Sequence, residues 1–321
     1  MKRIFVTGIN GLLGTNLCHS LINKGFEVTG LVRNKNSFKG KQHKNLKLLE
    51  GNLFDDFSLL FNNIDIIIHT AAVTNQNLIH YSEYFEVNSK ATIQLYNTAI
   101  TSNVKQFIFV STANTLGYGT LHFPGTENNK MNSLFRKSFY AKSKFEAENF
   151  LLKNKNTIAT IIVNPTFMLG AYDTKPSSGK IILMGWKKKL IFYPPGGKNF
   201  VHVKDVALGI VNAIDYGVSG EKYLLANENM SYQEFFISLN KVTNQKTIMI
   251  KIPKLVLIIM GYFGDILRWF HIRSSLSSVN MKILCVNNYF SNSKSKKELK
   301  ITYVPIESAI KDSIGYFQEN T

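Results

Sequence analysis

Cysteine is scarce in this chain, and the scarcity narrows the classes of protein to which it can belong. The 321 residues include two cysteines, Cys18 and Cys285, which lie far apart in the sequence. Two distant thiols provide neither a disulfide framework nor the paired spacing of a structural zinc site. We therefore expect a protein without disulfides or a bound metal, in a reducing compartment such as the cytoplasm.

Acidic residues are also few. Asp and Glu number 21 against 38 Lys and Arg, which gives a formal net charge of +17. Such a charge favours anionic partners: nucleic acid, an anionic membrane surface or phosphorylated ligands. The lysines are scattered, however, apart from clusters at 187–189 and 294–300, and no nucleic-acid-binding motif accompanies them. We interpret most of the charge as compositional bias and expect no nucleic-acid partner.

Long apolar runs are missing as well. The strongly apolar stretch at 255–264 (LVLIIMGYFG) has about 10 residues, whereas a membrane-spanning helix needs about 20. The first residues run directly into a strand-like segment, so we expect no secretory signal peptide. No repeat or low-complexity segment is evident. With 45% hydrophobic residues, the chain has enough apolar surface for a large buried core.

Strand-like and helix-like segments alternate regularly through the first half of the chain. Predicted strands occupy residues 3–7, 27–32, 46–49, 65–70, 106–111 and 158–163, and predicted helices occupy 12–23, 82–102 and 140–154. The strands are almost continuously β-branched or aromatic, which is typical of strands buried on both faces. The pattern predicts an α/β fold with a doubly wound, parallel, Rossmann-type sheet.

A glycine-rich turn follows the first predicted strand and opens the first helix. Gly8 and Gly11 permit a tight turn and close approach of a pyrophosphate, and Gly14 lets the helix pack closely on the sheet. The helix N-terminus offers free N–H groups and a partial positive charge to the phosphates. The turn therefore predicts a bound dinucleotide, with contacts from Thr7, Gly8, Asn10, Gly11, Leu12, Leu13 and Gly14.

The pattern changes after Gly170. Residues 171–199 are loop-like and rich in Pro and Gly, and a strand–helix unit at 200–216 and a short strand at 222–226 follow. We assign residues 1–170 to a dinucleotide-binding domain, to which 200–226 return. Residues 171–199 and 227–321 are assigned to a smaller, mostly helical substrate-binding lobe over the carboxyl ends of the strands.

Tyr140 and Lys144 are the strongest candidates for catalysis. Their spacing of four places them on one face of the predicted helix, one turn apart. An ammonium group near a phenol stabilises the phenolate and lowers the phenol pKa from about 10. The phenol is then expected to exchange a proton with a substrate carbonyl or alcohol near neutral pH.

These motifs, in this order, resemble the extended short-chain dehydrogenase/reductase family, also called the NAD-dependent epimerase/dehydratase family. The turn reads Gly-x-x-Gly-x-x-Gly, and other family motifs have counterparts in His69-Thr70-Ala71-Ala72, Val87-Asn88-Ser89-Lys90-Ala91-Thr92, Asn164-Pro165-Thr166 and residues 201–207. Ala91 stands where the family usually has Gly. The resemblance implies that Lys144 holds the nicotinamide ribose. It also implies cofactor contacts from Ala71, Ala72, Asn88, Tyr140, Lys144, Asn164, Pro165 and Thr166.

The resemblance also implies a third catalytic group, a hydroxyl after the fifth strand. The family pattern aligns Thr112 with the catalytic hydroxyl and Ser111 with its neighbour, while Leu116 replaces the usual Tyr. A hydroxyl here hydrogen-bonds the substrate oxygen and helps to polarise it. Thr112 is the preferred candidate and Ser111 the alternative.

The choice between NADP and NAD depends on the end of the second strand. An acidic residue there binds the adenine ribose and repels a 2′-phosphate, but this chain reads Leu31-Val32-Arg33-Asn34. Arg33 is suited to pair with a 2′-phosphate, which resembles the dihydroflavonol reductases. The family's adenine-contacting Gly-Asp-Leu is here Gly51-Asn52-Leu53. We favour NADP. NAD stays open, with Arg33 then a solvated surface residue.

Two replacements bear on the reaction. Ala113-Asn114 stands where nucleotide-sugar dehydratases have Asp-Glu, and Asn164-Pro165 where sugar-nucleotide enzymes usually have Arg-Pro. The chain therefore resembles most the dihydroflavonol reductase and 3β-hydroxysteroid dehydrogenase branch. That resemblance implies an NAD(P)-dependent oxidoreductase interconverting a ketone or aldehyde and an alcohol on a small, hydrophobic substrate.

Two alternatives stay open, because this fold hosts several activities. One is a nucleotide-sugar epimerase with tightly held NAD, in which Lys187–Lys189 would meet a diphosphate. The other is a non-catalytic dinucleotide-binding regulator, against which the intact Tyr140, Lys144 and Thr112 argue.

Residues 255–270 are expected to form a helix whose apolar side covers the substrate pocket and also touches a membrane. Trp269, Phe270, Arg268 and Arg273 provide the aromatic and basic edge typical of an interfacial helix. The alternatives are a core or lid helix and a dimer contact. The family resemblance itself implies a homodimer formed through two helices.

Overall fold

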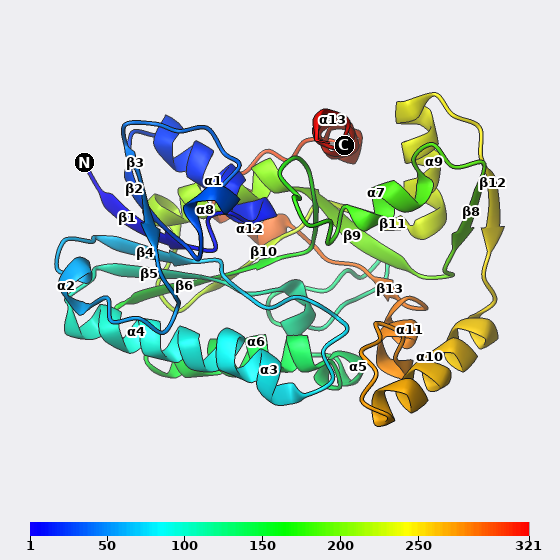
Figure 1. Ribbon diagram of the computed structural model, residues 1–321, viewed down its shortest axis with the longest axis horizontal. Coiled ribbons are helices and arrows are strands. Elements are labelled where there is room, and N and C mark those ends of the chain that lie inside the picture. Colours follow the sequence, from blue (N-terminus) through cyan, green and yellow to red (C-terminus); the bar gives the residue numbers. More distant parts are fainter. Residues whose placement is uncertain (321) are drawn as a thin grey trace.

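A seven-stranded sheet in which all strands are parallel forms the centre of the protein (Figure 1). The computed structural model describes residues 1–320. The strand order is β10-β6-β5-β4-β1-β2-β3. The strands are β1 (Arg3–Thr7), β2 (Glu27–Val32), β3 (Leu46–Glu50), β4 (Ile66–His69), β5 (Gln106–Val110), β6 (Ala159–Pro165) and β10 (Lys222–Leu225). The order reverses direction between β1 and β4, so the predicted doubly wound sheet is confirmed, and ligands of such sheets bind beyond the carboxyl ends of these two strands.

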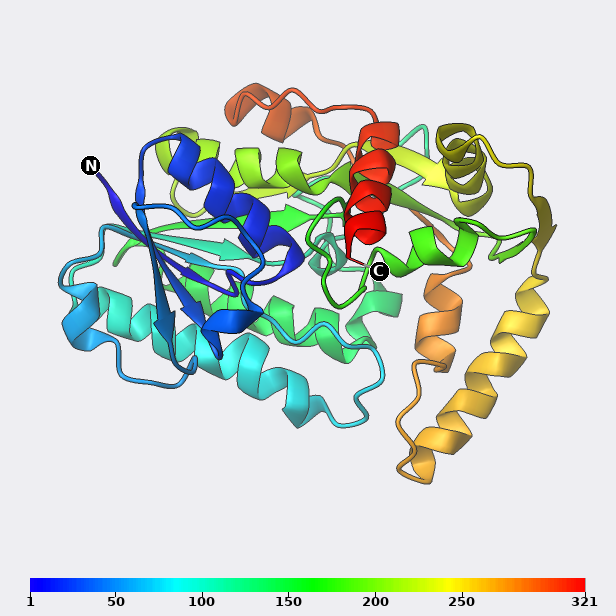
Figure 2. The ribbon, with the colours of Figure 1, turned by 45° about the horizontal axis from the view of Figure 1, so that its top comes forward.

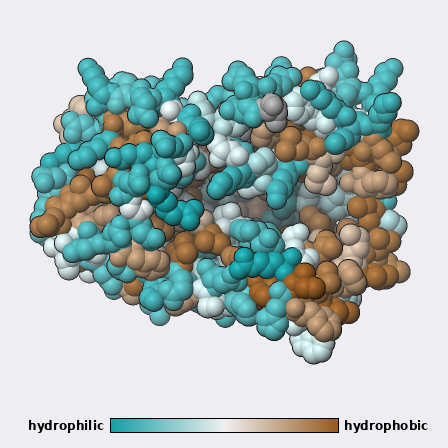
Figure 3. Space-filling view, in the orientation of Figure 1, coloured by the Kyte–Doolittle hydropathy of each residue, from teal (hydrophilic) through white to brown (hydrophobic). Residues whose placement is uncertain are grey.

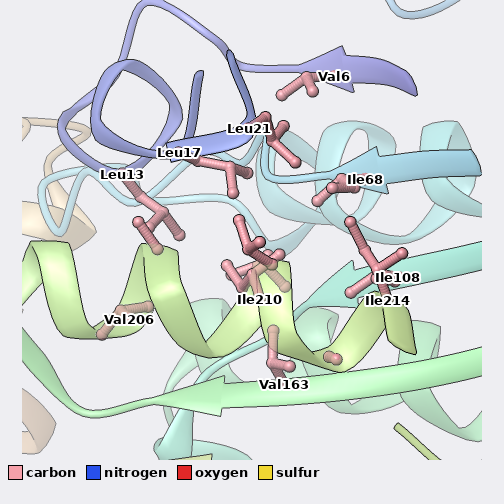
Figure 4. Close-up of a cluster of buried hydrophobic side chains, with 14 of the residues drawn as sticks. Val6, Leu13, Leu17, Leu21, Ile68, Ile108, Val163, Val206, Ile210 and Ile214 are labelled. Atoms are coloured by element: carbon pink, nitrogen blue, oxygen red, sulfur yellow. The ribbon is translucent and has the colours of Figure 1, made fainter. Parts of the chain in front are cut away.

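Helices cover both faces of this sheet, as Figure 1 shows. Helices α1 (Leu12–Asn23) and α8 (Val203–Tyr216) lie on one face, and α2 (Ser58–Phe61), α4 (Ala91–Thr101) and α6 (Phe139–Lys153) lie on the other. Figure 4 shows how leucines of α1 and aliphatic residues of α8 point at the sheet. The labelled residues are Leu13, Leu17, Leu21, Val206, Ile210 and Ile214 from the helices and Val6, Ile68, Ile108 and Val163 from the strands. Burial on both faces explains why these strands have continuous apolar sequences.

The helix predicted at 82–102 is interrupted. It consists of α3 (Tyr81–Phe85), a π-helical turn at Glu86–Lys90 and α4. Such a turn inserts one extra residue into the helix and changes the direction of the side chains it carries. Asn88 lies within it and is fully buried.

The second lobe contains two small sheets besides its helices. Strands β7 (Phe167–Leu169), β9 (Gly197–His202), β11 (Glu228–Ser231) and β13 (Asn287–Asn288) form one sheet, and β8 (Leu190–Tyr193) and β12 (Ile248–Lys251) form the other. Helices α7 (Lys180–Gly185), α9 (Tyr232–Thr243) and α13 (Ile306–Glu319) pack around them. Helix α8 and strand β10 do return to the large sheet as expected. The strand before α8 does not, because β9 pairs with β7, β11 and β13.

Helices α10 (Lys254–Trp269) and α11 (Ser278–Ile283) form a hairpin that projects from the body of the molecule (Figure 2). The short helices α5 (Ser133–Arg136) and α12 (Ser293–Glu298) complete the fold. Within residues 1–320, no helix is both long and apolar enough to cross a membrane.

Gly14 fixes the position of α1 against the turn that precedes it. A Cβ atom added at Gly14 would lie 2.1 Å from the carbonyl oxygen of Gly8 and 2.6 Å from the Cα atom of Ile9. Both neighbours are backbone atoms, so no side chain can move aside. The absence of a side chain at Gly14 thus serves close packing of α1 on the turn, whereas the sequence predicted close packing on the sheet.

We expect Gly14→Ala to lower the free energy of unfolding by about 1–3 kcal/mol, because the added methyl group must displace the turn. Gly315→Ala in α13 is the matched control, since a Cβ atom at Gly315 meets nothing within 4 Å. This control should be neutral or stabilising by about 0.5–1 kcal/mol, as alanine favours helix. Urea unfolding of both variants measures the difference. Equal stability of the two variants would show that the turn accommodates a side chain.

Candidate active site

The turn between β1 and α1 has the properties of a phosphate-binding site. Gly8 has a φ of 68°, and a Cβ atom there would lie 2.8 Å from the backbone N and Cα of Ala71. No side chain caps the N-terminus of α1, whose first turn carries no acidic residue. The first N–H groups of α1 are therefore open to an anion, and the residues present fit the pyrophosphate of a dinucleotide.

His69, at the end of β4, connects this turn to helix α4. Its Nδ1 lies 2.7 Å from the Thr7 hydroxyl, and its Nε2 lies 2.9 Å from the Thr92 hydroxyl. The Thr92 hydroxyl donates to the Asn88 carbonyl, so its oxygen accepts the Nε2 proton, and the Thr7 hydroxyl donates to Nδ1. Complete burial lowers the pKa of His69 to about 3, with the charge of Lys144 acting in the same direction. The imidazole is therefore neutral at physiological pH.

Asn88 continues the connection to the catalytic helix. Its Oδ1 accepts from the Val73 N–H at 2.8 Å, and its Nδ2 donates to the Val73 carbonyl and to the Ser143 hydroxyl, each at 3.0 Å. The Ser143 hydroxyl in turn donates to the Tyr140 carbonyl at 2.8 Å. Asn88 is buried and its amide is fully used by protein partners. Asn88 therefore positions the catalytic helix, and its contact with the cofactor stays a prediction.

Tyr140 stands in the first turn of α6, which Ser138 caps. The Thr112 side chain, two residues after the end of β5, is close enough to act on the phenol. Burial raises the pKa of Tyr140 to about 12, and the smaller effect of Thr112 opposes the shift. The expected lowering of the phenol pKa is therefore wrong for the protein alone. Tyr140 keeps its proton at neutral pH.

Lys144 lies beneath Tyr140 on the same face of α6 and is only 1% exposed. Its Nζ donates to the Val110 carbonyl at 2.6 Å and lies 4.1 Å from the centre of the Phe109 ring. Burial lowers the pKa of Lys144 to about 7, while Glu148 acts in the opposite direction. The lysine is thus anchored to the end of β5, the strand that leads to Thr112.

A buried cluster around Glu148 holds Thr112, and sequence reasoning missed it. The Glu148 carboxylate forms a salt bridge with Lys222 and accepts from the Thr115 hydroxyl at 2.6 Å and from Asn164 Nδ2 at 2.7 Å. The same Nδ2 donates to the Thr112 carbonyl at 3.1 Å. The signal was present in the sequence, because Glu148 follows Lys144 by four residues and so shares the catalytic face of α6.

The Asn164-Pro165-Thr166 motif lies at the end of β6, and Ser111, the alternative hydroxyl, directly follows β5. Asn164 and Pro165 are buried, and the Thr166 hydroxyl donates to Asn199 at 2.7 Å. Their cofactor contacts stay predictions. The hydroxyl of Ser111 is buried without a hydrogen-bond partner in residues 1–320, so it stays the alternative to Thr112.

Arg33 is exposed at the end of β2, and its side chain forms no ion pair or hydrogen bond in the described part of the chain. The loop that follows it closes onto the phosphate-binding turn, because Asn10 Nδ2 donates to the Ser37 hydroxyl at 2.8 Å. Across the sheet edge, Asn52 Oδ1 accepts from the Phe54 N–H at 3.2 Å, which leaves its NH₂ group open, and Leu53 is half-buried. Arg33 is thus available for a ligand anion beside this turn.

The predicted wall of the substrate pocket is not formed by the apolar side of α10. Leu255, Ile259 and Phe263 are 67%, 59% and 56% exposed, so these side chains face solvent. The reason is that α10 packs inward through its opposite side, which carries Leu257, Gly261, Gly264 and Asp265. Within residues 1–320, no cluster of three or more His, Cys, Asp or Glu side chains could hold a metal ion.

A family model described as "NAD dependent epimerase/dehydratase family" matches residues 4–226. The matched region contains the glycine turn, the His69 connection and the Tyr140–Lys144 pair. The chain belongs to this family. It is therefore an enzyme of the extended short-chain dehydrogenase/reductase type, as its motifs predicted.

Relatives of this enzyme include both oxidoreductases and epimerases. It is 27% identical to a sterol-4-alpha-carboxylate 3-dehydrogenase (decarboxylating) of Dictyostelium discoideum, over 94% of this chain and 96% of the relative. It is 25% identical to a putative dihydroflavonol 4-reductase of a Synechocystis species, over 98% and 94%. A UDP-glucose 4-epimerase of Vibrio cholerae is 28% identical, over 76% and 78%.

Solved structures share the whole architecture. The crystal structure of gox2253 superposes with a TM-score of 0.85 at 26% identity, covering 100% of this chain and 99% of the other. UDP-glucuronic acid 4-epimerase from Bacillus cereus, in complex with UDP-glucuronic acid and NAD, has a TM-score of 0.77 at 18% identity, covering 99% and 100%. The second likeness shows the fold alone.

We expect Lys144→Met to abolish turnover and to change how stability depends on pH. The Lys144 pKa falls from 10.5 to about 7 on folding, so between these values the unfolded chain holds a proton that the folded protein has released. Wild-type stability therefore rises with pH across this window, and the variant lacks that contribution. The free energy of unfolding of the variant minus that of wild type should be largest below pH 7 and smallest near pH 10.5. Urea unfolding across this range, without cofactor, measures the effect. Parallel pH profiles would contradict a buried, pKa-shifted Lys144.

Proposed function

We propose that this enzyme is an NADP-dependent reductase of ketones or aldehydes on small, hydrophobic substrates. The observation that carries the proposal is the pairing of Tyr140 and Lys144 one turn apart on α6, with Thr112 beside the phenol and burial keeping the phenol protonated. A protonated phenol is a proton donor. It therefore suits reduction of a carbonyl group at neutral pH better than removal of a proton from an alcohol.

Each residue of the site has a separate role in this reduction. A bound nicotinamide cofactor supplies the hydride in the reduction. Tyr140 donates its phenolic proton to the substrate oxygen as negative charge develops there, and the Thr112 hydroxyl donates a further hydrogen bond to that oxygen. Lys144, held to the Val110 carbonyl one turn along α6 from Tyr140, would hold the nicotinamide ribose. The α1 N-terminus and Gly8 hold the pyrophosphate.

Arg33 supports NADP as the cofactor. The family description specifies NAD dependence, and the preference for NADP over NAD is part of what we propose. The end of β2 offers an unpaired guanidinium in place of the carboxylate that would repel a 2′-phosphate. Asn10 and Ser37 join this corner to the phosphate-binding turn, so a phosphate at the adenine ribose would meet preformed partners.

The relatives support an apolar substrate, although they do not all agree. Proteins named as a sterol-4-alpha-carboxylate 3-dehydrogenase and a 3-beta-hydroxysteroid dehydrogenase match this chain nearly end to end. The relative named as a UDP-glucose 4-epimerase favours the second candidate, an epimerase with tightly bound NAD. Analysis of nucleotide released from purified protein separates the two candidates, because an epimerase retains NAD through purification and a reductase exchanges its cofactor at each turnover.

We expect Tyr140→Phe to lower kcat by about 10²–10⁴-fold while the dissociation constant for the cofactor stays within about twofold, because only the proton donor is lost. Thr112→Val should lower kcat by at least about tenfold. Ser111→Ala is its matched control and should change kcat little. Steady-state kinetics with an apolar ketone and a cofactor titration measure these effects. A Tyr140→Phe enzyme with more than about a tenth of wild-type kcat would contradict the role of Tyr140.

We expect Arg33→Asp to move the cofactor preference from NADPH toward NADH by at least about tenfold in the ratio of kcat/KM values, because a cation facing the 2′-phosphate is replaced by a repelling charge. Lys44→Asp is the control, as it makes the same change of charge at an exposed position before β3. The control should leave the ratio unchanged. If both variants shift the ratio equally, the effect is one of net charge and Arg33 has no specific role.

A further inference from the structure

Helix α10 turns its apolar side to solvent. Leu255, Ile259, Tyr262, Phe263, Ile266 and Trp269 follow the helical repeat along one face, and each is between 54% and 75% exposed. They line one face of the 16-residue helix, and that face carries no charged side chain. A helix of a soluble protein ordinarily buries such a face. An exposed apolar surface of this extent indicates a binding surface.

Packing and polar contacts hold α10 in this orientation. Gly261 and Gly264 face α11 and the segment before it, where added Cβ atoms would lie 2.8 Å from Ser278 Cα and 1.8 Å from the Leu276 carbonyl oxygen. Asp265 Oδ1 accepts from the Ser278 N–H at 3.1 Å. Arg268 donates to the Leu78 carbonyl, so Asp265 and Arg268 both make contacts on the inward side of α10. The outward direction of the apolar side is therefore built into the sequence of the helix.

The apolar surface continues from α10 onto the small sheet that precedes it. Strands β8 and β12 pair in a register that sets Ile248 beside Leu190 and Ile250 beside Phe192. All four side chains lie on one face and are 43–68% exposed. Figure 3 shows hydrophobic residues gathered on the right-hand side of the molecule, over β8, β12 and α10. We call this combined surface the apolar face.

Lysines border the apolar face. Lys187–Lys189 directly precede β8, and Lys246 stands two residues before β12. Because the two strands are parallel, these exposed cations gather at one end of the small sheet. Lys251 and Lys254 are exposed at the junction between β12 and α10. Cations beside exposed apolar and aromatic side chains are the combination that binds anionic lipid.

We propose that the apolar face binds an anionic lipid surface, with α10 lying in the plane of the interface. The aromatic rings of Tyr262 and Trp269 suit the boundary between headgroups and acyl chains. The formal charge of +17 attracts the protein to such a surface. The same charge opposes the other occupant of an apolar face, a second copy of this chain, because two copies repel each other.

Sedimentation of the full-length protein with vesicles tests the proposal. We expect binding to vesicles of mixed phosphatidylcholine and phosphatidylserine, weaker binding to phosphatidylcholine alone, and loss of the difference as salt is raised. Failure to sediment with the mixed vesicles at low salt overturns the proposal. Neither result depends on turnover, so the test is independent of the proposed reductase activity.

Paired variants assign the binding to the apolar face. Ile259→Asp with Phe263→Asp should weaken the partition into mixed vesicles by at least about tenfold. The loss of one large apolar side chain from the lipid interface alone lowers the partition coefficient by about that factor. Leu59→Asp with Val218→Asp is the matched control, because it makes the same change of charge at residues that are 83% and 55% exposed outside this face. Circular dichroism checks that both proteins fold. Equal weakening by both pairs overturns the assignment.

The alternative occupant is tested on the same proteins. Sedimentation equilibrium without lipid should give the same mass for wild type and for Ile259→Asp with Phe263→Asp. A wild-type dimer that this double variant splits into monomers would show that the apolar face joins two copies of the chain, and it would overturn the proposal. Lys188→Glu with Lys189→Glu should weaken the preference for phosphatidylserine, and an unchanged preference would contradict the role given to the lysines.

Discussion

The site depends on one interaction, the neutral imidazole of His69 between the hydroxyls of Thr7 and Thr92. It joins the end of β1, from which the phosphate-binding turn starts, to the helices on the other side of the sheet. The Thr92 hydroxyl donates to the Asn88 carbonyl, and the Asn88 side-chain amide donates to the Ser143 hydroxyl in the catalytic helix α6. A protonated imidazole could not accept the hydrogen bond from Thr7. Burial lowers the pKa of His69 to about 3 and so keeps the imidazole able to accept this bond. The phosphate-binding turn and the catalytic helix thus keep a fixed position relative to each other.

Burial also decides what the catalytic groups can do. It raises the pKa of Tyr140 to about 12 and lowers the pKa of Lys144 to about 7, so both shifts favour the uncharged forms. The protein opposes these shifts through polar partners: Thr112 at the phenol and Glu148 near the lysine. The Glu148 cluster also reaches the Thr112 carbonyl through Asn164, so the hydroxyl, the phenol and the lysine are fixed by connected contacts. A site built this way is suited to donate a proton.

The sequence predicted the parts of the structure that local patterns encode. The strands of the large sheet were predicted to within a residue or two because most of them consist largely of apolar residues. Gly14 was identified by its spacing from Gly8 and Gly11 in the turn. The short strands β7, β8 and β13 were not predicted, because pairing with distant segments decides whether so few residues form a strand. The π-helical turn at Glu86–Lys90 has no comparable local signature. Helix α10 was predicted, but the prediction that its apolar side covers the substrate pocket was wrong, because apolar periodicity normally indicates the buried side. Glu148 was missed because a charged residue in a helix is usually exposed.

The central claim is that Tyr140 and its neighbours carry out a net reduction with an exchangeable cofactor. Its most direct test is a turnover experiment with NADPH that carries deuterium at the transferable position of the nicotinamide, on a panel of apolar ketones, with mass analysis of the product. The account predicts one deuterium on the carbinol carbon and one NADPH consumed for each alcohol formed. A protein that instead purifies with bound NAD and converts a nucleotide sugar without net consumption of cofactor would contradict it.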